Sequence, residues 1–318
     1  MERIESFASS VKDEAVLLER DEECKRALLS SFIKINGHLS FKDGKEILEC
    51  HSERASIAKL IYQCLVSLYE VNVRFAYKRS AGFLKRINYL VVVEEKVDEI
   101  LSDLDIDILS NSLPRKEIRD GEEENASFFA GAFLAAGSTN DPTSSSYHLE
   151  IALADEEYTK WLSKALNKVN GGRFHSKVTK RRNQSIVYLK RSDEISDFLI
   201  LIGAKESCLA FENARIDRDF ANQTNRLENF DTANMKKTVA TAEKQIGYIH
   251  YFEKHGGIEQ FHNPKLTALC HLRLKHPDAS MLELSEYLSE ELASSVSKSN
   301  VNHLFRFLKK EYEESKHV

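Results

Sequence analysis

Apolar residues in the first two thirds of the chain recur at helical and strand spacing, in an order that occurs twice. Between 21 and 36 apolar and small residues follow the helical period, and Gly37 ends the run as glycine ends many helices. Asp43-Gly44 separates two short runs and is typical of a hairpin turn. The first copy is predicted as a helix (21–36), strands (38–43 and 46–51), a helix (53–69), strands (71–77 and 83–93) and a helix (94–104).

The same order of elements returns about one hundred residues later. Asp155 is a favourable helix cap, and Gly171-Gly172 introduces the last hairpin. A repeat of this size predicts two similar half-domains packed face to face. The second copy is predicted as a helix (122–136), a short strand near Ser138, a strand (147–153), a helix (155–169), strands (173–179 and 185–190) and a helix (192–202).

The last third of the chain has a different composition. Residues 206–230 are polar and rich in asparagine and arginine, which suits either a linker helix with phosphate donors or a solvated connector. Asn222, Asn225 and Arg226 are its candidate contacts. Thr232 is then expected to cap a helix over 233–253. Further helices are predicted after Asn263-Pro264, after Ser280 (281–288) and after Ser297 (298–313).

The final two helices have the pattern of a helix-turn-helix. Val301, Leu304, Phe305 and Leu308 lie at i, i+3, i+4 and i+7 and form one apolar face of the second helix. Its opposite face carries the polar side chains that contact base edges and phosphates in such modules. The candidate DNA contacts are Ser297, Lys298, Ser299, Asn300, Asn302, His303 and Arg306.

Composition limits the class of protein. A length of 318 residues suits two or three domains, and 42% hydrophobic residues suffice for real cores. Five widely spaced cysteines without a CxxC pair are expected to be reduced thiols. The sequence has neither an apolar run of ~18 residues nor a signal-peptide core, so we expect a soluble, cytoplasmic protein that does not enter a membrane.

The net charge of −5 hides two segments that contain cations and no acid. They occupy equivalent positions, in the second hairpin of each copy, and phosphate neutralisation is the obvious use of such surfaces. The same charges would serve RNA, and lysines that protect an edge strand are the structural alternative. The cations are Arg74, Lys78, Arg79, Lys85 and Arg86 in the first segment, and Arg173, Lys177, Lys180, Arg181, Arg182, Lys190 and Arg191 in the second.

The ends of the two repeated helices, 29–37 and 129–137, resemble the LAGLIDADG motif of homing endonucleases. In that family an acidic residue before each final glycine binds the catalytic metal. Here those degenerate metal positions are Asn36 and Ala136. A hard divalent cation needs anionic oxygen ligands, so we expect no metal, no cofactor and no nuclease activity.

The whole chain resembles the WhiA family of bacterial sporulation and cell-division regulators. The resemblance rests on the segments 6–14, 25–37, 131–138, 140–142, 145–150, 225–229, 233–234, 237–238, 276–280 and 297–303. It implies an α+β fold of two pseudo-symmetric LAGLIDADG-like αββαββα half-domains followed by an all-α helix-turn-helix domain. It also implies a transcriptional regulator that binds double-stranded DNA, located at the nucleoid. Asn300 departs from the pattern, where glycine is expected, and could alter base preference.

The expected domains are a first half (1–110), a second half (111–205), a linker (206–230) and the helix-turn-helix domain (231–318). Two alternatives stay open. An active Mg²⁺ nuclease would need Asp43 or Asp141 to replace the lost acids. A nucleoid-associated or cell-division scaffold or sensor would use the degenerate cleft for other regulatory proteins or a small ligand. The terminal module has a net charge of −2 over 279–318, which also suits protein contacts.

Overall fold

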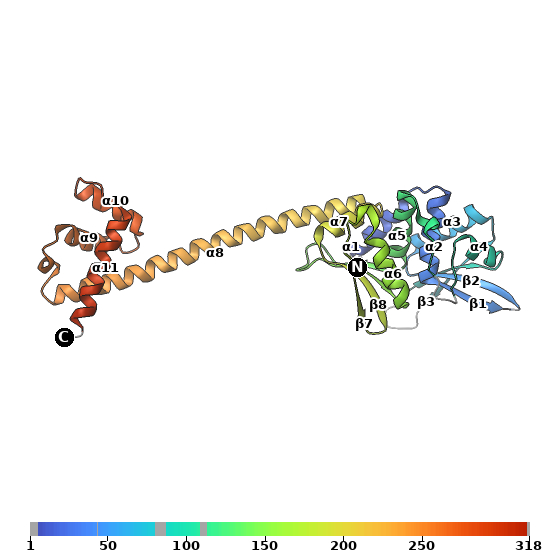
Figure 1. Cartoon of the computed structure of the whole chain (residues 1–318), viewed down its shortest axis with the longest axis horizontal. Helices are drawn as coiled ribbons and strands as arrows, with labels where there is room; N and C mark the ends of the chain where they lie inside the picture. The colour runs from blue at the N-terminus through green and yellow to red at the C-terminus, as the bar shows by residue number, and fades with distance from the viewer. Residues whose placement is uncertain (1–5, 43, 80–86, 109–112, 317–318) are drawn as a thin grey trace. The chain divides into compact units, whose positions relative to one another are not determined.

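The computed structural model describes residues 6–42, 44–79, 87–108 and 113–316. It separates into two compact units, Met1–Arg218 and Asp219–Val318 (Figure 1). The first unit combines helices with two four-stranded sheets, and the second is helical. The predicted α+β class is therefore confirmed. Within the described residues, no helix is long and apolar enough to span a membrane.

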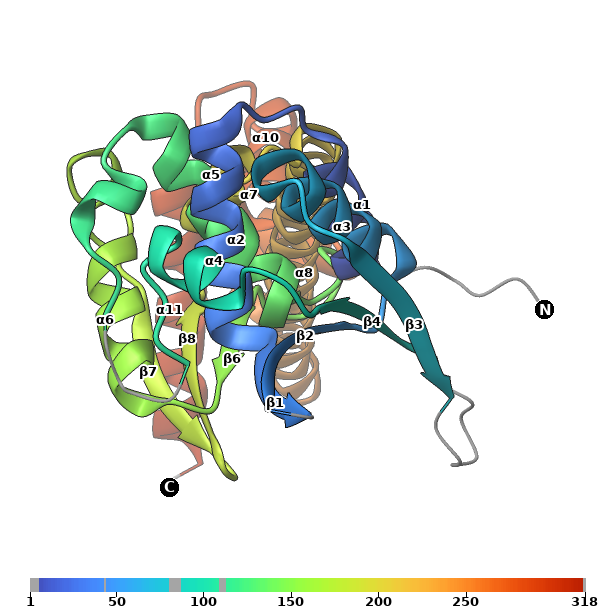
Figure 2. The ribbon, with the colours of Figure 1, turned by 90° about the vertical axis from the view of Figure 1, so that its right-hand side faces the viewer.

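The first unit is built around two helices, α2 (Glu22–Asn36) and α5 (Glu122–Ala136), that lie side by side (Figure 2). The Ser31 hydroxyl donates a hydrogen bond to the carbonyl of Phe128 at 2.5 Å and one to Leu28 at 3.2 Å. A Cβ placed on Gly131 would lie 2.3 Å from the Leu28 carbonyl and 2.3 Å from the Ser31 hydroxyl. The small side chains of Ser31 and Gly131 therefore permit contact between the two backbones.

The two sheets have the same topology. The first has the order β1-β2-β4-β3 and the second β5-β6-β8-β7, with every neighbouring pair antiparallel. The strands are β1 (Gly37–Lys42), β2 (Lys45–Ser52), β3 (Val73–Arg79), β4 (Ile87–Val93), β5 (Gly137–Thr139), β6 (Leu149–Leu153), β7 (Lys177–Arg181) and β8 (Gln184–Leu189). The internal repeat predicted from the sequence is thus a repeat of structure.

Helices cover one face of each sheet. Leu48 and Val93 of the first sheet pack with α2 and α3 (Ala55–Tyr69), and Ile151 and Val187 of the second pack with α5 and α6 (Glu156–Leu166). The closing helices are α4 (Val97–Asp103) and α7 (Ser192–Leu201). Asp155 caps α6 as predicted, because its carboxylate accepts from the backbone of Glu157 and Tyr158.

Two local predictions need correction. The strand expected over 173–179 begins only at Lys177, because the preceding segment packs Phe174 into the core instead of joining the sheet. Gly37 ends α2, but its φ of −82° lies outside the left-handed region. Glycine is needed there for space, since a Cβ would lie 2.4 Å from the Ile33 carbonyl. Residues 83–86 of the predicted fourth strand and Asp43 lie outside the described residues.

An N-terminal helix that the sequence analysis did not predict joins the two halves. In α1 (Phe7–Leu17), Val11 enters the core of the second half and Ala15 that of the first. The Glu14 carboxylate accepts hydrogen bonds at 2.8 Å from the backbone amides of Glu206 and Ser207. Because these amides are free at a helix start, α1 also anchors the beginning of α8.

The expected interruption at Thr232 is wrong, because one continuous helix, α8, spans Lys205–Lys254. Its last turns contribute Ile249 and Phe252 to the core of the second unit. That unit continues with α9 (Pro264–Lys275), α10 (Met281–Glu291) and α11 (Lys298–Ser315). The predicted caps Asn263, Ser280 and Ser297 each accept a hydrogen bond from the first turn of their helix.

We predict that Gly131→Ala lowers the free energy of unfolding of the first unit by about 1–3 kcal/mol. The added methyl group forces the backbones of α2 and α5 apart, and this overpacking exceeds the gain in helix propensity. Denaturant unfolding measures the change. The control is Gly247→Ala in α8, where a Cβ meets no atom within 4 Å and the substitution should stabilise by about 0.5–1 kcal/mol. A stabilising Gly131→Ala would contradict close backbone contact.

Candidate nucleic-acid interface

Each sheet has a face that the helices leave uncovered, which we call its open face (Figure 2). Side chains alternate between the two faces of a strand, so the residues that join the helix-covered core identify which face a position belongs to. Because Val91 and Val93 are buried under the helices, their β3 partners Phe75 and Val73 share that side. Arg74 between them therefore lies on the open face of the first sheet.

The open face of the first sheet carries Arg74 and Lys78, both exposed. Arg74 also contacts Glu94 at 2.6 Å, in an exposed pair that screening by water weakens. Burial lowers the pKa of the His51 imidazole, and the charges of His38 and, to a smaller extent, Lys78 add to this shift. The side chain of Arg79, with Lys85 and Arg86, lies outside the described residues.

In the second sheet, the open face receives Lys177, Arg181 and Lys190. Lys177 is paired in register with Tyr188, and the Lys190 ammonium lies 5.6 Å from the centre of the Tyr188 ring. Arg181 contacts Glu150 at 2.7 Å on the same face. Burial opposes ionisation of Glu150, yet hydrogen bonds from His148 and Arg181 hold the pKa of its carboxyl below the usual value. This face is thus basic but not purely cationic.

The other predicted cations of that segment do not share this face. Three of them extend toward the helices and contact acidic side chains there, an outcome that the acid-free sequence segment did not reveal. Arg182 occupies the β7–β8 turn with a φ of 56° and is exposed. The three ion pairs are Lys180 with Glu156, Arg173 with Asp197, and Arg191 with Glu194.

The two degenerate metal positions lie where α2 and α5 end. The Asn36 amide donates to the Ala135 carbonyl at 3.0 Å and to the His51 carbonyl at 3.4 Å. It thereby satisfies a carbonyl that the end of α5 leaves without a partner. A carboxylate cannot donate such a bond, and the methyl group of Ala136 offers no ligand atom. This chemistry suits a contact between helices, and neither position carries a carboxylate.

A cleft of ≈ 620 Å³ opens beside these positions, lined by Asn36, Ala136, His51, Arg54 and Lys12 among others. Lys12 donates from its ammonium to the Leu134 carbonyl at 3.3 Å, another free carbonyl of α5. Burial lowers the pKa of Lys12 to about 8, and the neighbouring Arg54 contributes to the shift. A lysine side chain therefore lines the cleft beside Asn36 and Ala136.

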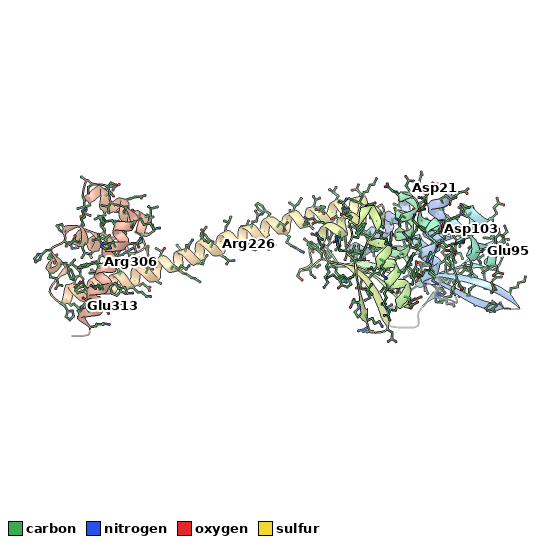
Figure 3. The ribbon with its side chains drawn as sticks, in the orientation of Figure 1. Asp21, Glu95, Asp103, Arg226, Arg306 and Glu313 are labelled. Atoms are coloured by element: carbon green, nitrogen blue, oxygen red, sulfur yellow. The ribbon has the colours of Figure 1, made fainter. Side chains whose placement is uncertain are left out.

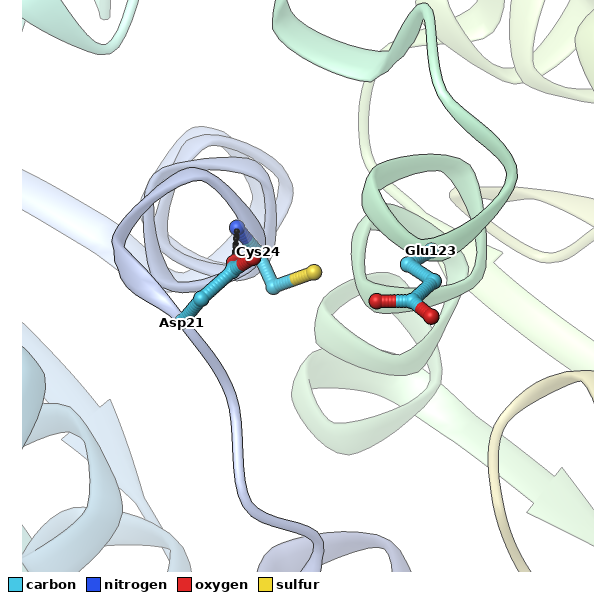
Figure 4. Close-up of side chains that lie close together, drawn as sticks. All are labelled: Asp21, Cys24 and Glu123. Carbon is cyan, nitrogen blue, oxygen red and sulfur yellow. Dashed lines mark hydrogen bonds between the residues drawn. The ribbon is translucent and has the colours of Figure 1, made fainter.

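Among the residues that the structure describes, one group could offer three metal ligands: Asp21, Cys24 and Glu123 (Figure 4). It lies at the opposite ends of α2 and α5, where their first turns begin. The Asp21 carboxylate accepts from the Cys24 amide at 2.8 Å and so acts as the helix cap. Burial raises the pKa of the Cys24 thiol to about 11, which disfavours the thiolate a metal needs. Helix capping accounts for the Asp21 carboxylate and its contact with Cys24.

Asp141, the alternative nuclease acid, has a local structural role. Its carboxylate accepts a hydrogen bond at 2.8 Å from the backbone amide of Thr143, which forms a turn between β5 and β6. Hydrogen bonds from Thr143 also lower the pKa of Asp141. This geometry gives no support to the idea that Asp141 replaces the lost acids.

In the second unit, α10 and α11 form the predicted helix-turn-helix. Val301, Leu304, Phe305 and Leu308 are all buried, as the sequence pattern requires. In the turn, the Ser289 hydroxyl accepts from the Val296 amide at 2.9 Å. These contacts hold α11 so that its polar outer face is directed away from the core.

The candidate base-contacting residues lie along that outer face. Ser299, His303 and Arg306 are exposed, and Arg306 projects from α11 (Figure 3). Asn302 is only partly exposed, and its amide donates to the Lys298 carbonyl at 3.0 Å within the helix. Ser297, Lys298 and Asn300 are exposed at the helix start. Asn222, Asn225 and Arg226 are exposed along α8, and Figure 3 labels Arg226.

Arg273 positions this module, a role that the sequence analysis missed. It is 1% exposed and donates to Gln245 of α8 at 3.0 Å and to the carbonyl of Ala279 at 2.6 Å. Burial lowers the pKa of its guanidinium. The side chain therefore joins α8, α9 and the segment before α10. A single arginine within an apolar helical pattern was the only available sequence signal.

Comparison with known proteins gives matches along almost the whole chain. Three family models match: the WhiA N-terminal LAGLIDADG-like domain (residues 22–107), the WhiA LAGLIDADG-like domain (125–221) and the WhiA C-terminal HTH domain (224–312). A probable cell division protein WhiA from Lactobacillus gasseri is 40% identical over 305 residues, 95% of each chain. One from Staphylococcus saprophyticus is 36% identical over 306 residues, again 95% of each.

Among solved structures, a full-length WhiA protein from Thermatoga maritima has a similar fold. Its TM-score is 0.60 at 22% sequence identity, and the match covers 98% of this chain and 99% of that one.

We predict that Asn36→Leu lowers the free energy of unfolding of the first unit by about 1–2 kcal/mol. The substitution keeps the approximate size of the side chain but removes the donor that joins α2 to the end of α5. Denaturant unfolding measures the loss. The control, Asn183→Leu in the exposed β7–β8 turn, should change stability by less than about 0.5 kcal/mol. Equal stability of the two variants would show that Asn36 does not join the helices.

Proposed function

Because the chain belongs to the WhiA family, we propose that it is a DNA-binding transcriptional regulator of bacterial cell division and sporulation. In this proposal α11 contacts base edges through Ser299, Asn302 and Arg306. The open faces of the two sheets hold backbone phosphates. The protein would act at the nucleoid, with residues 1–205 as the two half-domains, 206–230 as the linker and 231–318 as the DNA-reading domain.

The phosphate-binding part of the proposal rests on how the cations are divided between the two faces of the second sheet. Lys177, Arg181 and Lys190 share one face, while Lys180 and Arg173 pair with acids on the other side. A duplex following the open face would meet the first group and not the second. Electrostatic contacts of this kind position a protein on DNA and carry no sequence information by themselves.

We further propose that the protein does not cut DNA. Asn36 and Ala136 replace the metal-binding acids, and Asn36 is engaged with the neighbouring helix. Two-metal hydrolysis needs converging ligands that hold the ions about 4 Å apart. The residues at this position do not supply them.

The cleft beside Asn36 supports a second candidate function, in which the body binds a protein partner or a small ligand as a scaffold or sensor. Its ≈ 620 Å³ and mixed lining of Lys12, Arg54 and His51 would suit a polar group. This role is compatible with DNA binding by the terminal module.

We predict that Asn302→Ala combined with Arg306→Ala relaxes sequence preference by roughly 1–3 kcal/mol for each base edge that is no longer bound. Capture of fragmented genomic DNA by the full chain, followed by sequencing, measures the preference. The matched control is Lys309→Ala with Lys310→Ala, further along α11, where both lysines contact glutamates. Unchanged site preference in the first variant would contradict the proposal that Asn302 and Arg306 contact bases.

We predict that the full chain leaves supercoiled plasmid DNA intact when Mg²⁺ is added. The positions that would hold the ion carry an amide and a methyl group, neither of which replaces a carboxylate ligand. Gel electrophoresis separates supercoiled from nicked plasmid and measures the outcome. Nicking that increases with protein concentration would refute the non-enzymatic proposal.

We predict that Lys177→Ala with Lys190→Ala reduces the salt dependence of DNA affinity. Removing one cation that neutralises a phosphate lowers the slope of log affinity against log salt by about 0.9. Titrations at several salt concentrations measure this slope. The matched control is Lys180→Ala with Arg173→Ala, which removes the same charge from the side that faces the helices. Equal slopes for both variants would place the duplex elsewhere.

A further inference from the structure

Helix α8 exposes large apolar side chains in a regular pattern that the proposed function does not use. Leu209, Ile216, Phe220, Leu227 and Phe230 are 57%, 62%, 74%, 66% and 64% exposed. Their spacings, seven, four, seven and three residues, fit the a and d positions of one heptad repeat. The a and d positions that lie between these apolar residues hold Asn213 and Gln223, and Asn234 occupies the a position after Phe230. We call the eight positions the seam.

The seam lies away from the contacts that α8 makes in the first unit. Phe211 is fully buried in the core, and Arg218 donates to the Pro142 carbonyl at 2.9 Å. Both are f positions of the heptad, on the side of the helix opposite a and d. Leu209 and Ile216, at d positions, remain exposed. The contacts of α8 with the rest of the first unit therefore leave Leu209 and Ile216 exposed.

The seam also ends before α8 enters the core of the second unit. The next d and a positions are Lys237 and Thr241, both polar. The helix enters that core through Ile249 and Phe252, which are b and e positions. From 209 to 234 the repeat covers almost four heptads, and five of its eight a and d positions are apolar.

We propose that the seam binds the seam of a second copy of this chain, forming a parallel two-stranded coiled coil. A heptad face fits a helix with the same repeat, because each apolar side chain enters a space between four residues of the partner. Five large apolar side chains exposed along one face of a helix indicate an interaction surface. The proposal does not rest on the DNA-binding function.

The polar positions select the parallel, in-register arrangement. In the parallel, in-register arrangement each polar seam residue faces the same residue of the second copy. The polar positions Asn213, Gln223 and Asn234 are therefore all paired with a polar side chain. An antiparallel arrangement that pairs Asn213 with Gln223 places Asn234 opposite residue 202, before α8 begins. Polar core positions fix register at a cost in stability, so the dimer should depend on protein concentration.

The flanking charges are mixed. In the parallel arrangement Arg226 faces Asp231 of the second copy, which is favourable, while Glu212 faces Asp217, which is not. Such a dimer would bring two helix-turn-helix modules into one assembly, as proteins that bind two-fold symmetric sites require.

Sedimentation of the full chain over a wide concentration range tests the proposal. Phe220→Glu with Leu227→Glu should raise the dimer dissociation constant by at least about 30-fold. The matched control, Asn222→Glu with Asn229→Glu, adds the same charges at the same spacing on the outer face of α8 and should leave dimerisation unchanged. Circular dichroism verifies that both variants keep their helix content. A monomer at all concentrations, or equal dimerisation of the two variants, overturns the proposal.

A disulfide test checks the register independently. The five native cysteines are buried, so an introduced cysteine should react selectively. Mild oxidation should link the Gln223→Cys chain into covalent dimers, because equivalent core positions face each other, whereas Asn222→Cys should remain largely unlinked. Linkage through Asn222→Cys but not Gln223→Cys would overturn the seam as the contact surface.

Discussion

The first unit depends on the contact between the backbones of α2 and α5. Ser31 donates to the Phe128 carbonyl across this contact, and Gly131 leaves no room for a side chain against Leu28. Each helix leads through a glycine into the first strand of its own sheet. The distance between the helices therefore sets the positions of both sheets, and with them the spacing of the two open faces.

The same contact changes the chemistry at the helix ends. The LAGLIDADG motif that these helices resemble has a metal-binding acid at each helix end. In this chain an amide and an ammonium group, from Asn36 and Lys12, donate to carbonyls at the end of α5 instead. Donors at a helix C-terminus also interact favourably with its partial negative charge. These donors thus support the crossing of the two helices.

The second unit is organised by a different constraint, a buried arginine. Arg273 joins α8 to the segment before α10, and the apolar face of α11 closes the same core. Burying a guanidinium costs free energy unless its donors are satisfied, and here carbonyls and Gln245 accept them. The outer face of α11 is consequently held by a rigid core, which is what contact with base edges requires.

The sequence by itself determined the repeated order of elements, the helix caps, the core face of α11 and the loss of the acids, because each depends on local periodicity or on residue type. Tertiary structure decided the rest. It separated Lys177 from Lys180 and Arg173, since a side chain finds its acidic partner on another element. It joined the expected linker to the following helix as α8, because Thr232 as a cap is only a weak local preference. It also gave α1 its place, since Val11 and Ala15 acquire partners only when the two halves come together.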